Sequence, residues 1–68
     1  MDVVPIRDES IRLGQFLKLA NLVDSGSDAK ALLAEGVVRV NGEVEARRGR
    51  QLAKGDMVTL GDAEARVG

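Results

Sequence analysis

The spacing of apolar residues predicts a first amphipathic helix within residues 11–23. Apolar side chains recur there at intervals of three and four residues, which aligns them on one helical face: Leu13, Phe16, Leu17 and Ala20. Ser10 stands at a suitable position for the N-cap. Gly14 lies early in the helix, where glycine costs up to about 1 kcal/mol relative to alanine, so we expect another backbone to pass close to it.

A second helix is predicted over residues 26–35. Ser25 stands three residues before Asp28, as in an approximate capping box. The apolar face continues at helical spacing through Ala29, Leu32 and Leu33. Gly36 follows, and glycine is the usual residue for a left-handed helix stop. Only a few residues separate the two helices, so we expect them to share a core.

After Gly36 the apolar period changes from 3.6 to two, which is typical of β-strands. Asn41 and Gly42 both accept positive φ, so they predict a tight turn between two strands. We expect Arg39 to point away from the core and three valines to point toward it: Val38, Val40 and Val44.

Two further turns lead into short strands with alternating apolar residues. They are predicted at residues 54–56 and 61–62, and the inward positions after them are Val58, Leu60, Ala63, Ala65 and Val67. Pro5 restricts the opening segment VVPI to an edge strand. No repeat, linker or low-complexity segment is present. The pattern therefore predicts one α+β domain over residues 1–68, with two short helices packed on a small, mainly antiparallel β-sheet.

The composition excludes several classes of protein. The 68 residues include no cysteine and no histidine, so disulfides and the usual zinc sites are ruled out, and we expect neither a metal nor a cofactor. No catalytic constellation is evident, so we do not expect an enzyme. No apolar run reaches the length of a membrane span, and the start of the chain lacks the pattern of a secretory signal. We expect a soluble, cytoplasmic protein that does not bind membranes.

Positive charge is concentrated in one segment of a chain whose formal net charge is -1. Residues 37–54 carry two acids, Glu43 and Glu45, against five bases: Arg39, Arg47, Arg48, Arg50 and Lys54. The remainder of the chain is acidic. A basic run is more often a solvated surface than a binding site, so charge by itself leaves nucleic-acid binding as one of two alternatives.

Three segments in order, LGQFLKLA, SGSDAKALLAEGVVRVNGE and RRGRQLAKGD, resemble the S4 RNA-binding domain. Within that family the chain is similar to the small stand-alone bacterial S4-like proteins of the YaaA/YbcJ type. The match covers about residues 13–60, and its specificity rests on the ordered set of motifs. The resemblance implies an αL fold, in which two packed helices and a short loop to a strand form an L-shaped surface that lies on structured RNA. It also implies a ribosome-associated role, with ribosomal or transfer RNA as the target.

One position departs from the wider S4 pattern, in which Ser-Arg starts the second helix and a basic residue follows four positions later. Gly26 stands in place of that arginine, and Lys30 is the later basic residue. Asp28 adds negative charge beside the helix start, where free N–H groups otherwise favour a phosphate. The stand-alone subgroup is similar in having Ser-Gly and a lysine. Whether this helix start contacts phosphate is therefore left open.

With the resemblance, eight residues become candidate RNA contacts: Lys18, Lys30, Arg39, Asn41, Arg47, Arg48, Arg50 and Lys54. Gly49 frees the backbone between the arginines, so that neighbouring guanidinium groups can reach different phosphates. Asn41 has turn formation as its alternative role. Phe16 is the only aromatic residue and belongs to the apolar helix face, so bases find no stacking platform. We expect contacts to phosphates and 2′-hydroxyls of folded RNA, with little base readout.

A protein-interaction module without RNA preference is the alternative function. In that hypothesis four acids offset the arginines locally: Asp24, Asp28, Glu35 and Asp56. An RNA-modifying enzyme does not fit, because 68 residues leave no room for a catalytic domain beside the S4-like part. The expected partners are therefore structured RNA and, beside it, a separately encoded RNA-processing or ribosomal protein.

Overall fold

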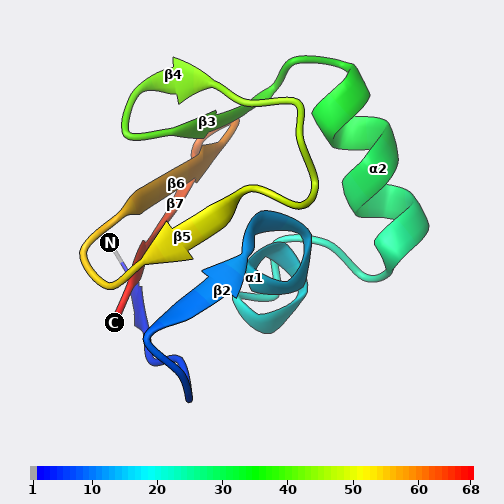
Figure 1. Ribbon diagram of the computed structural model, residues 1–68. Coiled ribbons are helices and arrows are strands. Elements are labelled where there is room, and N and C mark those ends of the chain that lie inside the picture. The colour runs from blue at the N-terminus through cyan, green and yellow to red at the C-terminus, as the bar shows by residue number, and fades with distance from the viewer. Residues whose placement is uncertain (1) are drawn as a thin grey trace.

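The computed structural model describes residues 2–68, which form two β-sheets and two helices (Figure 1). In chain order these elements are β1 (Asp2–Val4), β2 (Ser10–Arg12), α1 (Leu13–Leu19), α2 (Gly26–Ala34), β3 (Val38–Val40), β4 (Glu43–Val44), β5 (Gln51–Ala53), β6 (Met57–Leu60) and β7 (Ala63–Val67). Five strands form one sheet in the order β1-β7-β6-β3-β4, and β2 pairs with β5 in a second sheet. Among the described strands, β1 and β7 run parallel and the other pairs are antiparallel. The predicted α+β architecture with a mainly antiparallel sheet is confirmed.

The predicted turns produce the expected hairpins. Asn41 and Gly42 have φ angles of 53° and 87°, which is the backbone that a two-residue hairpin turn between β3 and β4 requires. Gly61 likewise has a φ of 60° between β6 and β7. The opening segment forms the edge strand β1, as predicted.

One inward position was predicted wrongly, and another lies on the predicted side but is exposed. The two-residue turn places Val44 directly opposite Arg39, and cross-strand partners share one side of a sheet, so Val44 points outward with Arg39 and is 54% exposed. Ala63 lies on the same side of the sheet as its cross-strand partner Leu60 and as Ala65, but it is exposed at the start of β7, next to the Gly61 turn. Inward packing along β3 and β7 therefore comes from Val38, Val40 and the later residues of β7.

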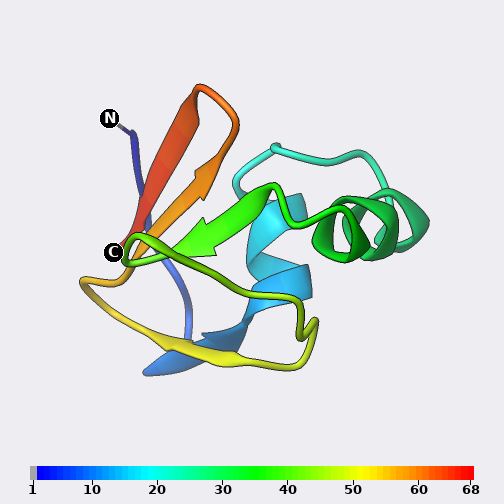
Figure 2. The same cartoon turned by 90° about the horizontal axis from the view of Figure 1, so that it is seen from above.

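The core forms where α1 packs between the five-stranded sheet and α2, as Figure 2 shows from above. Phe16 is fully buried, which confirms that it is a core residue. The buried apolar residues are Ile6, Leu13, Phe16, Leu17, Val23, Ala29, Leu33, Val38, Val40, Leu52, Val58, Ala65 and Val67. Residues from both helices and both sheets belong to this one cluster, so the two sheets and the helices are held together by a shared core.

Helix α2 agrees with the sequence prediction to within a residue. The Ser25 hydroxyl accepts a hydrogen bond from the Asp28 N–H at 3.2 Å, which is the predicted N-cap contact. The helix ends before Gly36, which has a φ of 75°. Neither α1 nor α2 is long and apolar enough to cross a membrane.

Helix α1 begins later than predicted. Ser10 is not its N-cap, because residues Ser10–Arg12 are extended and pair with β5. The helix therefore starts at Leu13, after Arg12, which supplies no side-chain cap. At the other end, Asn21 has a φ of 61°, and the Leu22 N–H donates to the Leu17 carbonyl at 2.9 Å, as in a Schellman motif.

Candidate nucleic-acid interface

The loop between β4 and β5, residues 45–50, contains three arginines and lies against the start of α1. The Leu13 N–H donates to the Arg50 carbonyl at 2.8 Å, and the Gly14 N–H donates to the Arg48 carbonyl at 3.0 Å. These carbonyls take the place of a side-chain N-cap, since the first N–H groups of a helix have no partner within the helix. The loop and the helix start are thus fixed relative to each other by backbone contacts.

Gly14 makes this docking possible. A Cβ atom added at Gly14 would lie 2.5 Å from Cγ of Arg48 and 3.5 Å from the Arg48 carbonyl oxygen. The expectation that a second backbone passes close to Gly14 is therefore confirmed, and the segment that passes is the one carrying Arg48. Glycine permits the Arg48 stem to lie directly against the helix.

Glu45 holds two residues of this loop, Arg47 and Arg50, through hydrogen bonds. Its side chain is buried, and its Oε1 accepts hydrogen bonds from the backbone N–H and the Nε of Arg47, both at 3.1 Å. Its Oε2 accepts from Nη2 of Arg47 at 3.3 Å and from Nη1 of Arg50 at 3.1 Å. The Arg50 N–H donates to the Arg47 carbonyl at 3.3 Å and closes a turn over residues 47–50, here called the 47–50 turn.

These contacts hold Glu45 in its charged form. The side-chain and backbone hydrogen bonds from Arg47, helped by the one from Arg50, lower the pKa of Glu45 from its ordinary 4.5 to about 2. The same pairing raises the pKa of Arg47. One carboxylate therefore neutralises part of the charge of two arginines, while Arg48 lies between them outside this network.

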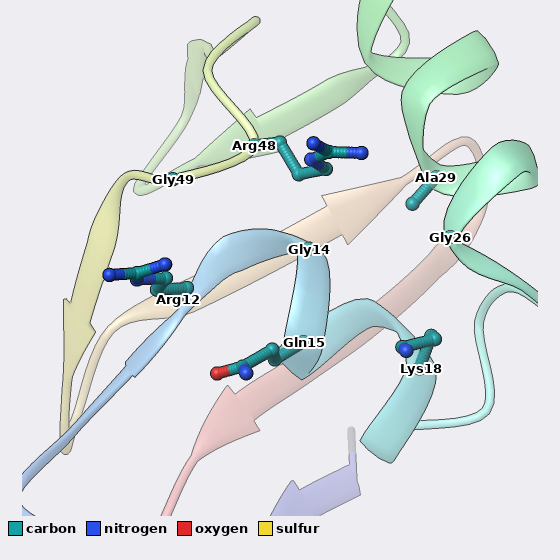
Figure 3. Close-up of a pocket in the computed structure, with 8 residues that line it drawn as sticks. All are labelled: Arg12, Gly14, Gln15, Lys18, Gly26, Ala29, Arg48 and Gly49. Atoms are coloured by element: carbon teal, nitrogen blue, oxygen red, sulfur yellow. The ribbon is translucent and has the colours of Figure 1, made fainter.

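Arg48 lines a hollow between α1, α2 and the loop. The hollow has a volume of about 340 Å³ and is lined by Arg12, Gly14, Gln15, Lys18, Gly26, Ala29, Arg48 and Gly49. Figure 3 shows the Arg48 side chain extending from the loop over Gly14 toward Ala29 on α2. Three basic residues from different elements line it: Arg12 of β2, Lys18 of α1 and Arg48 of the loop. No acidic residue is among the lining residues. This cationic hollow is a concave surface that fits an anionic group.

The structure brings some of the predicted contacts together and separates others. Lys18 and Arg48 line the cationic hollow. Arg47 and Arg50 lie beside it in the Glu45 network, with side chains 77% and 30% exposed. Lys30 is exposed on α2 but does not line the hollow.

Three predicted contacts lie away from the hollow. Arg39 faces the side of the sheet opposite its buried neighbours in β3, and its Nη1 donates to the Gly42 carbonyl at 3.4 Å. Asn41 serves the fold: its Oδ1 accepts from the Met57 N–H at 2.9 Å, and its Nδ2 donates to Asp56 at 3.2 Å. Lys54 is exposed in the turn before β6.

Two lining residues were missed by the sequence reasoning, Arg12 and Gln15. They precede Lys18 at intervals of three residues, so the three polar side chains follow one side of the predicted helix, away from Leu13 and Phe16. That periodic polar face was the available signal. What the sequence did not indicate was that Arg48 would meet this face.

Within residues 2–68, none of the four acids proposed to offset the arginines forms a salt bridge with an arginine. Asp24, Asp28 and Glu35 line a different hollow beside Leu22 and Leu32. Asp56 accepts a hydrogen bond from the Ala53 N–H at 2.8 Å and belongs to the turn before β6. The acid that pairs with Arg47 and Arg50 is Glu45.

Comparison with known families agrees with this architecture. Residues 4–68 match the model of a family described as S4 domain. The chain belongs to the S4 domain family. This S4 domain is 51% identical over 57 residues to a Bacillus subtilis (strain 168) protein named "Probable ribosome maturation protein RlbA", covering 84% of this chain and 80% of that protein. It is 35% identical over 57 residues to the Escherichia coli (strain K12) protein named "Putative RNA-binding protein YbcJ", covering 84% and 81%.

A solved structure shares the fold of this S4 domain. The 30S ribosomal protein S4e from Thermoplasma acidophilum superposes with a TM-score of 0.66 at 23% identity, over 88% of this chain. The matched part is 32% of the S4e chain, so this S4 domain spans about a third of that larger protein. The resemblance to small S4-like proteins that the sequence motifs indicated is confirmed by the family match and by the two relatives.

Proposed function

We propose that this protein is a non-catalytic RNA-binding protein that grips the backbone of structured RNA. One observation carries the proposal: Arg12, Lys18 and Arg48 line one hollow, and no acidic residue is among its lining residues. Guanidinium and ammonium groups at such a surface suit phosphate oxygens, and phosphate contacts supply most of the affinity in sequence-independent binding. Family membership and the names of the relatives support RNA as the ligand.

Recognition on this surface is of backbone shape. The only aromatic ring in the chain, Phe16, is fully buried, so no base can stack on it. The cationic hollow forms the centre of the proposed site, and Arg47, Arg50 and Lys30 extend it. We place Arg39, Asn41 and Lys54 outside the centre. Low sequence specificity and contacts to phosphates and 2′-hydroxyls follow from this arrangement.

Ribosomal RNA is the target we propose first, with transfer RNA second. The relative named for ribosome maturation supports this choice, because it is 51% identical to the chain. A separately encoded ribosomal or RNA-processing protein is the partner in such a role. Sequencing RNA that is crosslinked to the protein in cells tests the target: enrichment of ribosomal RNA supports the proposal, and an even sampling of cellular RNA contradicts it.

A salt titration of RNA binding tests the site. Each cation that neutralises a phosphate releases condensed counterions, so replacing Arg48 by alanine should weaken binding and flatten the log–log salt slope by roughly 0.7–0.9. Arg12→Ala and Lys18→Ala should act in the same way. The matched control is Arg66→Ala, which removes an exposed arginine on β7, outside the hollow. If the control flattens the slope as much as Arg48→Ala does, the hollow is not the site.

A further inference from the structure

The proposed function does not explain why an acidic residue, Glu45, is buried beside the cationic hollow. It is an acid beside a surface proposed to bind RNA, and on charge alone it should weaken binding. Its side chain is nevertheless buried, and it makes four hydrogen bonds to the two arginines that flank Arg48 and Gly49. The carboxylate of Glu45 therefore holds the residues on both sides of Arg48, which lines the hollow.

The connection runs through the 47–50 turn. Glu45 fixes the backbone of Arg47 at one end of the turn and the guanidinium of Arg50 at the other. The carbonyls of Arg48 and Arg50 are then directed at the first N–H groups of α1, at 3.0 and 2.8 Å. With both ends of the turn held, the Arg48 stem lies against Gly14 and its guanidinium faces the hollow.

We infer that Glu45 is a positioning residue for RNA binding, which holds the 47–50 turn so that Arg48 faces the cationic hollow. In this role the negative charge of Glu45 favours RNA binding, because the order it imposes on Arg48 outweighs its own repulsion of phosphate. The inference rests on the proposed function. Simple electrostatics predicts that loss of one acidic charge raises the affinity for RNA, whereas this inference predicts that loss of the Glu45 charge lowers it.

The first test compares two charge-matched variants. Glu45→Gln keeps the shape of the side chain but replaces one accepting oxygen with an NH2 group, which donates and cannot accept from the arginine groups that face it. Glu43→Gln removes the same charge from an exposed position on β4. We expect Glu43→Gln to leave affinity for a short RNA hairpin unchanged or slightly higher, and Glu45→Gln to lower it on the order of threefold to tenfold. An affinity for Glu45→Gln equal to or above that of Glu43→Gln overturns the inference.

A second variant separates position from charge. Glu45→Asp keeps the charge but is one methylene shorter, so it cannot reach both arginines in the same geometry. The inference predicts weaker RNA binding for Glu45→Asp, while a role through charge alone predicts no change, and no change overturns the inference. Binding is measured at a temperature at which circular dichroism shows every variant folded, so lost binding reports the site and not unfolding.

A double-mutant cycle shows whether Glu45 acts through Arg48. In an Arg48→Ala background, Glu45→Gln should no longer weaken binding, because the side chain that it positions is gone. An equal loss in both backgrounds overturns the positioning role, since a merely structural effect does not depend on Arg48. The same data keep the two proposals apart: if Arg48→Ala leaves the affinity and salt slope of the wild-type protein unchanged, the proposed function fails, whereas a failure confined to the Glu45 variants removes only the positioning role.

Discussion

At the scale of single residues, Glu45 is a buried acid whose negative charge is paired with two arginines. Within residues 2–68 it is the buried acidic side chain, and its hydrogen bonds require the ionised carboxylate. Two arginines that would otherwise repel each other are held beside each other by one acid. A charge count along the chain therefore overstates the free positive charge of the loop, because Arg47 and Arg50 are partly neutralised and Arg48 is not.

The lowered pKa of Glu45 predicts a pH dependence of stability. A carboxylate with a folded-state pKa of about 2 and an ordinary value of 4.5 stabilises the fold fully above pH 4.5, and this contribution is lost as the pH falls toward 2. Between pH 5 and 2 the melting temperature of the wild-type protein should therefore fall further than that of Glu45→Gln. Glu43→Gln serves as the control, and its melting temperature should follow that of the wild type. Parallel curves for Glu45→Gln and the wild type would show that the pairing does not stabilise the fold.

At the scale of elements, the two helices obtain their N-terminal caps in different ways. Helix α2 is capped locally by Ser25, whereas α1 is capped by carbonyls of the loop before β5. A local cap depends only on neighbouring residues and is visible in the sequence. The α1 cap depends on a segment far along the chain, so the start of α1 and the shape of the arginine loop are determined together.

The local cap gives a stability prediction. Replacing Ser25 by alanine removes the acceptor of the Asp28 N–H and should lower the free energy of unfolding by about 1 kcal/mol. Urea denaturation at neutral pH measures this difference. Ser27→Ala is the matched control, since Ser27 is exposed within the first turn of the same helix. An equal effect of the two substitutions would mean that the cap contributes nothing specific.

At the scale of the whole molecule, the basic and acidic residues line two different hollows. The cationic hollow lies between the two helices and the loop, while the acidic hollow beside Leu22 and Leu32 is formed by other residues. A chain with net charge -1 can thus present a cationic hollow, because Asp24, Asp28 and Glu35 line a different hollow. Net charge describes the molecule and not the site.

The shape of the surface predicts a preference for RNA over DNA. A-form duplexes offer 2′-hydroxyls across a wide, shallow minor groove, which B-form DNA of the same sequence lacks. At one salt concentration, an RNA hairpin should therefore bind more tightly than a DNA hairpin of matching sequence, and the difference should shrink in Arg48→Ala. Fluorescence anisotropy with both labelled hairpins measures it. Equal affinity for the two would indicate a basic patch that responds to charge without reading A-form geometry.

The sequence by itself determined the elements whose causes are local. The apolar period located both helices, Ser25 and Gly36 marked the ends of α2, and Asn41 and Gly42 marked the first hairpin, because caps and tight turns depend on a few adjacent residues. The same local reasoning placed Val44 on the wrong side, since the register across the turn decides that side.

Only the tertiary structure decided which charges meet. Arg12 and Lys18 come from one end of the chain and Arg48 from the other half, and they share a hollow because Gly14 lets the loop lie on α1. Glu45 looked like one of two acids diluting a basic run, and the fold made it the partner of Arg47 and Arg50. Contacts of this kind depend on how all the elements pack around the core, and no local pattern records that packing.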